Sequence, residues 1–405
     1  MPVITIFSGI FCGAEAVCRH VGPATGHRLI DDEAIVRRAA DMSAMPAIKI
    51  RRTLSAKTSV FNAFTHEKEG SIAGLRLALA TALQDGPAIV HGFSSLLMPA
   101  SINPGLRVCI FADLPYRLRQ ADNLSRMDEK EALKRIRQRD DQSAAWTEYL
   151  FADRDPWDSR HYDLMLPMHR MDAPEAGLRI EGLLRDPAAD GEGTAIQAQE
   201  DFLLAASVEM ALFKAGHTAS VSTGNGAVTL AIDKHSPMPP HLDAQLKSIA
   251  EAVPGVRSVA LRMEGDGDPN RIYRQYRADV PSRVLLVDDE KEFVLTLSER
   301  LQLRDMGSAV VHDGESALTL IDEDEPEVIV LDLKMPGIGG LEVLKRVKAT
   351  RPAIEVIVLT GHGSATDRRQ CMALGAFAYM QKPVDIDDLS ENLKKAHEKI
   401  RKFSA

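Results

Sequence analysis

Cysteine is scarce in this sequence of 405 residues, which holds only four. No two of them form a C-x-x-C pair, so the sequence predicts neither a disulfide framework nor a zinc site. We interpret all four as ordinary buried thiols in a reducing compartment, and we expect a cytoplasmic protein. The four are Cys12, Cys18, Cys109 and Cys371.

Excess positive charge and a long apolar run are also missing. The net charge is −9, which argues against nucleic acid as a partner. The apolar run from Val3 to Cys18 lacks a basic flank and is interrupted by Glu15, so no membrane segment is expected. With 45% hydrophobic and 26% charged residues, the composition is typical of a globular protein, and the length suggests two or three domains.

The clearest pattern lies between Arg283 and Ala405, where short β-branched runs alternate with amphipathic helices. Continuous apolar strands of this kind predict a parallel α/β sheet covered on both faces. The expected strands are RVLLVDD (283–289), SAVVH (308–312), EVIVLD (327–332), EVIVLT (355–360) and FAYMQ (377–381).

Five residues with reactive or polar side chains follow or end these strands. Asp288 and Asp289 end the first strand, Asp332 the third and Thr360 the fourth, and Lys382 follows the fifth. The carboxyl ends of parallel strands meet in one crevice. Three carboxylates gathered there repel one another unless a cation joins them, and ligands that offer only oxygen suit Mg²⁺. The sequence therefore predicts a magnesium site.

The same five residues predict a phosphoryl-transfer site. Asp332 is the expected nucleophile, because a carboxylate can form an aspartyl phosphate. Mg²⁺ and the Lys382 ammonium would neutralise charge on the transferring oxygens, and the Thr360 hydroxyl would donate a hydrogen bond to one of them.

The motifs VDDE, LDLKMPGIGG, LTGHG and KP occur in this order, and the region resembles the receiver domain of two-component response regulators, a five-stranded flavodoxin-like fold. The resemblance implies that a sensor histidine kinase or phosphotransfer protein phosphorylates Asp332. It also implies that the Lys334 carbonyl joins the aspartates at Mg²⁺, that the Lys382-Pro383 bond is cis, and that Tyr379 is a switch residue near the partner-binding face.

At the other end of the chain, ITIFSGIFCGAEAV (4–17) has the layout of a phosphate-binding loop, an apolar strand followed by a glycine turn and a helix. Gly9 and Gly13 lie in the turn. Glu15 follows where a working loop needs a lysine, and its carboxylate would repel phosphates. The loop is therefore expected to be degenerate, and a nucleotide there is doubtful.

The first 170 residues resemble the cytidylate kinase-like family of P-loop nucleoside monophosphate kinases, on the segments ITI, LIDDEAIVRRAAD, AIVHG, EKEALKRIRQRD and YDLML. Departures lie at chemically important positions. Besides Glu15, the stretch 91–93 reads His-Gly-Phe where Gly-Arg-Gly is usual, and Ser143 stands where an arginine is expected. We therefore expect an inactive pseudokinase. The alternative is a nucleoside monophosphate kinase gated by the receiver.

Between these regions lies a module with the order helix, hairpin, helix, strand. Alternating residues flank Asn225-Gly226, a strong hairpin signal because both residues tolerate positive φ. The module is similar to BON domains in the pattern of its helices and strands.

The expected organisation is a kinase-like domain at 1–185, a BON-like module at 195–265, a linker at 266–282 and a receiver at 283–405. We expect a signalling protein rather than an enzyme, with an unidentified protein as its output target. Homodimer formation is left open, and neither nucleic acid nor a membrane is expected as a partner.

Overall fold

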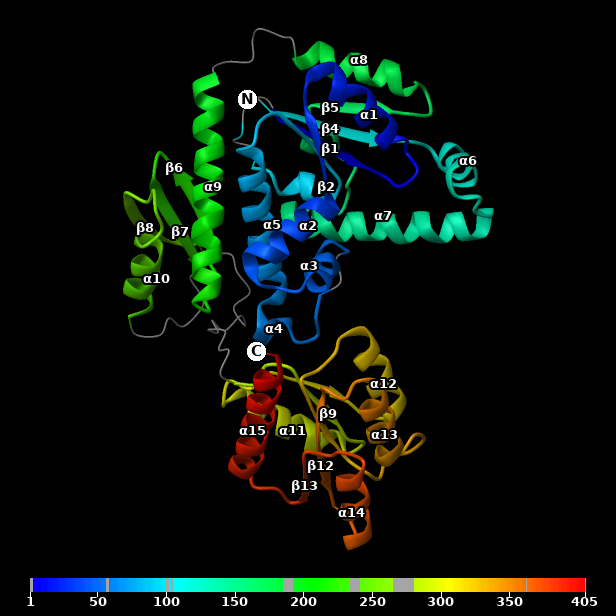
Figure 1. Cartoon of the computed structure of the whole chain (residues 1–405), viewed down its shortest axis with the longest axis vertical. Coiled ribbons are helices and arrows are strands. Elements are labelled where there is room, and N and C mark those ends of the chain that lie inside the picture. Colours follow the sequence, from blue (N-terminus) through cyan, green and yellow to red (C-terminus); the bar gives the residue numbers. More distant parts are fainter. Residues whose placement is uncertain are drawn as a thin grey trace. The chain divides into compact units, whose positions relative to one another are not determined.

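The computed structural model describes residues 3–55, 58–99, 102, 105–184, 192–233, 241–264, 280–361 and 363–404. The chain forms two compact units. One consists of Met1–Thr58 and Lys68–Tyr273, and the other of Ser59–Glu67 and Arg274–Ala405. Figure 1 labels many of their elements. In the part of the chain that is described, none of the helices has the length and apolar character that crossing a bilayer requires.

A five-stranded parallel sheet forms the core of the first unit, in the order β2-β3-β1-β4-β5. Side chains of the central strand alternate between two apolar layers. Ile4 and Ile6 belong to one layer, whereas Val3 and Phe7 belong to the other. The strands are β1 (Val3–Ser8), β2 (Arg28–Asp31), β3 (Ala88–His91), β4 (Gly105–Phe111) and β5 (Leu164–Pro167).

Helices cover both faces of this sheet. α1 and α8 pack beside Ile4 and Ile6, and α2 and α5 pack in the layer of Val3 and Phe7. The helices are α1 (Ala14–Thr25), α2 (Asp32–Ser43), α3 (Ala47–Leu54), α5 (Glu67–Leu83), α6 (Leu114–Ser125), α7 (Glu129–Phe151) and α8 (Ala173–Leu184), with the 3-10 helices η1 (Phe93–Leu97) and η2 (Ser159–His161).

A three-stranded sheet follows in the chain. Its elements are α9 (Glu192–Lys214), β6 (Ser220–Gly224), β7 (Ala227–Asp233), α10 (Leu242–Glu251) and β8 (Ser258–Glu264). β6 and β7 form an antiparallel hairpin, and β8 pairs with β7 in parallel. Asn225 and Gly226 have φ of 52° and 81°, so the predicted hairpin turn is present. The likeness to BON domains stays a prediction.

The second unit contains a parallel sheet in the order β10-β9-β11-β12-β13. This order agrees with the flavodoxin-like fold expected from the sequence. The strands are β9 (Val284–Val287), β10 (Ser308–Val311), β11 (Val328–Leu331), β12 (Glu355–Thr360) and β13 (Ala378–Gln381). The helices are α4 (Asn62–Thr65), α11 (Lys291–Gln302), α12 (Gly314–Glu323), α13 (Gly340–Thr350), α14 (Ala365–Ala373) and α15 (Ile386–Ser404).

Alternation along β9 builds two apolar layers in this unit. Val284 and Leu286 pack with α11 and α15, and Leu285 and Val287 pack with α12 and α13. All four side chains are at most 1% exposed, which explains why both faces of the strand are apolar in sequence. Removing one of them, as in Leu286→Ala, would cost about 2–5 kcal/mol of folding free energy.

The four cysteines are buried and unpaired, as predicted. Burial raises the pKa of Cys12 to about 11 and that of Cys18 to about 12, so both remain protonated thiols near neutral pH. Most of the predicted linker at 266–282 lies outside the described residues. The module predicted to begin at residue 195 starts with α9, which already begins at Glu192.

Candidate functional site

The three aspartates predicted to form a metal site lie together at the carboxyl edge of the second sheet. β9 and β11 are parallel neighbours with Val287 opposite Leu331, so the residues that follow these two strands are adjacent. Ligand oxygens of Asp288, Asp289 and Asp332 all lie within 4.8 Å of one another. Asp288 and Asp332 are buried, whereas Asp289 is exposed.

Lys382 brings positive charge into this cluster from the end of β13. Its Nζ lies 2.7 Å from Asp288 Oδ2, 2.7 Å from Glu290 Oε1 and 3.9 Å from Asp332 Oδ2. Burial opposes the charge of Lys382, but hydrogen bonds to Asp288 and Glu290 outweigh it and raise the lysine pKa. Burial raises the pKa of Asp288, although Lys382 opposes that shift. The peptide bond to Pro383 is cis, as expected.

Backbone groups orient both buried carboxylates. The Leu333 N–H donates to Asp332 Oδ1 at 2.8 Å, and the Glu290 N–H donates to Asp288 Oδ1 at 3.0 Å. The loop after Asp332 returns so that Gly340 packs against the Asp332 backbone. A Cβ at Gly340 would lie 1.9 Å from the Asp332 carbonyl oxygen. Only glycine fits there without moving the loop, which also carries the exposed Lys334.

Thr360 ends β12 and is 1% exposed. Its carbonyl accepts a hydrogen bond from the Lys382 N–H at 3.0 Å, so the two strand ends are joined. Tyr379 pairs with Val358 on the neighbouring strand. Its hydroxyl is buried and has no hydrogen-bond partner among the described residues, and burial raises its pKa.

Gly363 lies against Tyr379. A Cβ on this glycine would come 1.6 Å from the Tyr379 hydroxyl oxygen and 3.0 Å from the Thr360 methyl carbon. The glycine therefore provides the space that the tyrosine hydroxyl occupies.

The loop of the first unit has the predicted layout. Gly13 has φ of +80° and caps α1, a conformation that favours glycine. Gly9 and Glu15 line the same cavity of about 800 Å³, and Glu15 lies exposed in the first turn of α1. A carboxylate at a helix N-terminus is locally favourable, but here it faces the position where phosphates would bind.

Sequence reasoning missed a cation in this cavity. Arg139 lines it, one helical turn before Ser143, and its guanidinium carbon lies 3.8 Å from the Phe93 ring centroid. Burial lowers the pKa of Arg139, opposed by Asp32. Ser143 is 1% exposed and does not line the cavity.

Two neighbouring aspartates have distinct structural roles. Asp31 caps α2 by accepting the Ala34 N–H at 2.8 Å. Asp32 accepts the N–H groups of Phe93 and Ser94 at 2.9 and 2.8 Å. Asp32 therefore fixes the His-Gly-Phe segment that stands in place of Gly-Arg-Gly.

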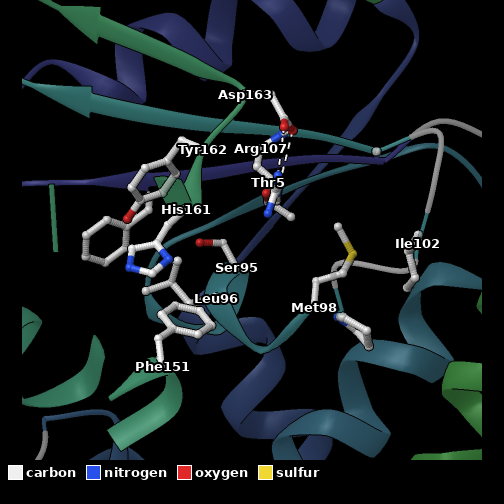
Figure 2. A pocket seen from close by; sticks show the side chains of 13 residues that line it. Thr5, Ser95, Leu96, Met98, Ile102, Arg107, Phe151, His161, Tyr162 and Asp163 are labelled. Atoms are coloured by element: carbon white, nitrogen blue, oxygen red, sulfur yellow. Dashed lines mark hydrogen bonds and ion pairs between the residues drawn. The ribbon is translucent and has the colours of Figure 1, made fainter. Parts of the chain in front are cut away.

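A second cavity of about 220 Å³ lies in the first unit, where β1 and β4 face η1 and η2 (Figure 2). The side chains of Arg107 and Asp163 form an ion pair of 2.8 Å on one side. On another side, the rings of His161 and Phe151 stack 4.7 Å apart. His161 also lies 3.2 Å from Asp153, so Arg107, Asp163 and His161 all have protein partners already.

Comparison with known proteins identifies two matched regions. The response regulator receiver domain model matches residues 284–394, and the cytidylate kinase-like family model matches residues 3–170. The sporulation initiation phosphotransferase F of Bacillus subtilis is 32% identical over 113 residues, which cover 28% of this chain and 91% of that protein.

The transcriptional regulatory protein TrcR of Mycobacterium tuberculosis is 37% identical over 122 residues, which cover 30% of this chain and 48% of that protein. The chain thus spans about half the length of this relative. A solved response regulator receiver domain protein from Clostridium thermocellum is 29% identical with a TM-score of 0.29, covering 30% of this chain and 97% of that chain.

The chain belongs to the response regulator family through its receiver domain at residues 284–394. Residues 3–170 are similar to the cytidylate kinase-like family, so the chain combines a receiver with a kinase-like region.

Proposed function

We propose that the receiver of this response regulator is phosphorylated on Asp332 by a sensor histidine kinase or a phosphotransfer protein. The observation that carries the proposal is the setting of Asp332. Its carboxylate is buried at the end of β11, within 4.8 Å of Asp288 and Asp289 and 3.9 Å from the Lys382 ammonium. A nucleophilic carboxylate beside both a cation-binding cluster and a fixed positive charge suits phosphoryl transfer.

The donor set at this edge fits Mg²⁺. The three carboxylates offer only oxygen ligands. Opposite ligands of an octahedral Mg²⁺ are about 4.2 Å apart, and the three carboxylate oxygens lie within 4.8 Å of one another, so they are close enough to bind one ion. We propose Asp288, Asp289, Asp332 and the Lys334 backbone carbonyl as the groups that hold the ion. Bound there, Mg²⁺ would supply positive charge beside the phosphoryl oxygens.

The protein's own groups divide the remaining work. A carboxylate oxygen of Asp332 attacks phosphorus, the new O–P bond forms, and the P–N bond of a phosphohistidine donor breaks with its electron pair going to the imidazole. Lys382 stabilises charge on a phosphoryl oxygen, and the Thr360 hydroxyl donates a hydrogen bond to another.

We propose that the contact to Thr360 acts as a switch. Because it forms only with the phosphorylated state, it favours one of two packings around Tyr379 and changes the face made by α14 and β13. The neighbouring Gly363 and the unbonded Tyr379 hydroxyl support this role, since the ring has no hydrogen bond to lose when it moves.

For the remainder of the chain we propose an inactive kinase-like output domain at 1–185, a BON-like module at 195–265, a linker at 266–282 and the receiver at 283–405. Glu15 in the loop cavity supports inactivity, because its charge opposes phosphate binding. A cytoplasmic location, an unidentified protein target and the oligomeric state remain predictions.

One observation favours a second candidate, a nucleoside monophosphate kinase gated by the receiver. Arg139 places a guanidinium in the loop cavity, so this cavity does not lack positive charge as the sequence suggests. Turnover of CMP and ATP to CDP by the purified protein, lost in Asp332→Ala, would establish this candidate in place of the first.

The proposed phosphorylation is tested with acetyl phosphate and Mg²⁺ on the full chain. Labelling should disappear in Asp332→Asn and persist in Asp322→Asn, which changes an exposed carboxylate of α12. Labelling retained in Asp332→Asn would mean that the nucleophile is a different residue.

A further inference from the structure

Arg283 forms a buried ionic cluster with two acidic residues far from it in sequence. Its Nη1 lies 2.8 Å from Glu67 Oε2, and its Nη2 lies 2.5 Å from Asp324 Oδ1. The three side chains are only 6%, 6% and 7% exposed. All three residues belong to the second compact unit, which contains the segment Ser59–Glu67 together with the receiver.

Asp324 also binds the start of this segment. Its Oδ2 accepts hydrogen bonds from the Ser59 hydroxyl and the Val60 N–H, both at 2.8 Å. Its other oxygen accepts from Arg283. One carboxylate thus holds a side chain and a backbone group of the segment while its charge is neutralised by the receiver's arginine.

Aromatic residues of the segment complete the contact. Phe61 is fully buried, and its ring centroid lies 5.0 Å from the guanidinium carbon of Arg283. Phe64 packs against Gly307, where an added Cβ would come 2.5 Å from Phe64 Cβ and Cγ. The segment therefore places one aromatic ring over the guanidinium of Arg283 and a second against Gly307, where only the absence of a side chain leaves room.

The cluster is costly to bury unless its partners are all in place. A buried ion pair is sustained only by good geometry and further hydrogen bonds, and loss of one partner leaves an uncompensated charge. Here Arg283 also donates from Nε to the Glu325 carbonyl at 3.1 Å. Burial and these additional hydrogen bonds distinguish the cluster from a solvent-exposed salt bridge and are typical of a specific docking contact.

The receiver groups in this contact lie at the edge of the sheet opposite Asp332. Arg283 precedes β9, Gly307 precedes β10, and Asp324 caps the carboxyl end of α12. Asp332 follows the carboxyl end of β11. The segment lies within residues 3–170, which match the cytidylate kinase-like family, and Glu67 is the first residue of α5.

We propose that the amino-terminal edge of the receiver sheet is a docking surface whose partner is Ser59–Glu67 of the same chain, and that the receiver engages the kinase-like sequence through this segment. The proposal rests on the proposed function in one respect only, namely that the receiver is the regulatory part of the chain. The surface differs from the α14 and β13 face, which remains available for a separate partner.

Hydrogen exchange of the full chain, measured by mass spectrometry on peptides covering 59–67, tests this docking. Asp324→Ala should raise the exchange rate of the Val60 amide by at least about tenfold, because the acceptor of that amide is removed. Asp322→Ala, which changes a carboxylate that is 68% exposed, should leave the rate unchanged. Equal rates in all three proteins would overturn the proposal.

A second variant carries its substitution in the segment Ser59–Glu67 and therefore controls for general unfolding of the receiver. Phe64→Ala removes the ring that covers Gly307 and should also raise exchange in 59–67. Acetyl phosphate labelling of Asp332 should persist in both docking variants. The two proposals can then fail separately, because Asp332→Asn removes the label without changing any residue of the ionic cluster around Arg283. Protection that increases with protein concentration would show docking between copies and would also overturn the proposal.

Discussion

The Lys382 ammonium lies 2.7 Å from a carboxylate oxygen of Asp288 but 3.9 Å from the nearest oxygen of Asp332. In this arrangement the lysine is engaged mainly by Asp288 and Glu290. A phosphoryl group on Asp332 would have to compete with these two carboxylates for the same ammonium. The strength of that competition should affect both the rate of phosphorylation and the affinity for a cation.

Lys382→Met should slow phosphorylation by acetyl phosphate by about 10²–10³, the usual effect of losing one group that stabilises transition-state charge. The same change should tighten Mg²⁺ binding, because the aspartate cluster loses its compensating positive charge. Labelling rates and a Mg²⁺ titration check both effects. Lys395→Met, which removes an exposed lysine of α15, is the control. A variant that loses both properties would indicate simple misfolding.

Gly363→Ala should destabilise the receiver by about 1–3 kcal/mol, because the added methyl group collides with the Tyr379 hydroxyl. Tyr379→Phe alone should be neutral or slightly stabilising, since that hydroxyl has no partner among the described residues. Combining the two should recover part of the loss. Calorimetry of the full chain and its three variants measures the coupling, and strictly additive effects would contradict this packing.

The kinase-like region should not convert CMP and ATP to CDP above background, because Glu15 lies where phosphates would bind. A chromatographic assay for CDP with the full chain checks this expectation. Should turnover be found, Arg139→Ala distinguishes a real site from contamination. A rate reduced by about 10²–10³ would assign activity to this cavity and reject the pseudokinase proposal.

Glu209 should make stability depend on pH. Burial raises the pKa of this α9 glutamate to about 7, opposed by Arg76, whose Nη1 lies 3.3 Å from its carboxylate. A pKa raised in the folded state contributes stability that is complete below the unfolded value of 4.5 and is lost as pH rises toward 7.

The free energy of unfolding should therefore fall by up to about 1.4 kcal/mol per pH unit across that window. Glu209→Gln should remove most of this slope in urea unfolding of the first unit. Glu200→Gln, an exposed change on the same helix, should retain it. A slope of the same size in both variants would mean that other groups titrate there.

The sequence was most informative where function depends on strand ends. Asp288, Asp289, Asp332, Thr360 and Lys382 could be placed together because parallel strands end at one edge. The strands lie within two residues of the expected bounds, since short apolar runs between amphipathic helices leave little freedom in register.

Contacts between distant segments could not be read in this way. Glu290 was missed because it lies beyond the strand end, as the N-cap of α11, where the strand pattern does not predict that its carboxylate reaches Lys382. Arg139 was missed because its direction on α7 depends on how that helix packs over Phe93. The pairing of Arg283 with Glu67, 216 positions apart, has no local pattern at all.

The buried ionic cluster of Arg283, Glu67 and Asp324 also limits how this chain can be divided into fragments. A kinase-like fragment ending near residue 185 would retain Phe61 without the receiver arginine that covers it, and a receiver fragment would retain Arg283 and Asp324 without Glu67. Each fragment would expose a surface suited to its missing half. Exchanging this receiver for that of another response regulator would require introducing Arg283, Gly307 and Asp324 at the equivalent positions of the new receiver.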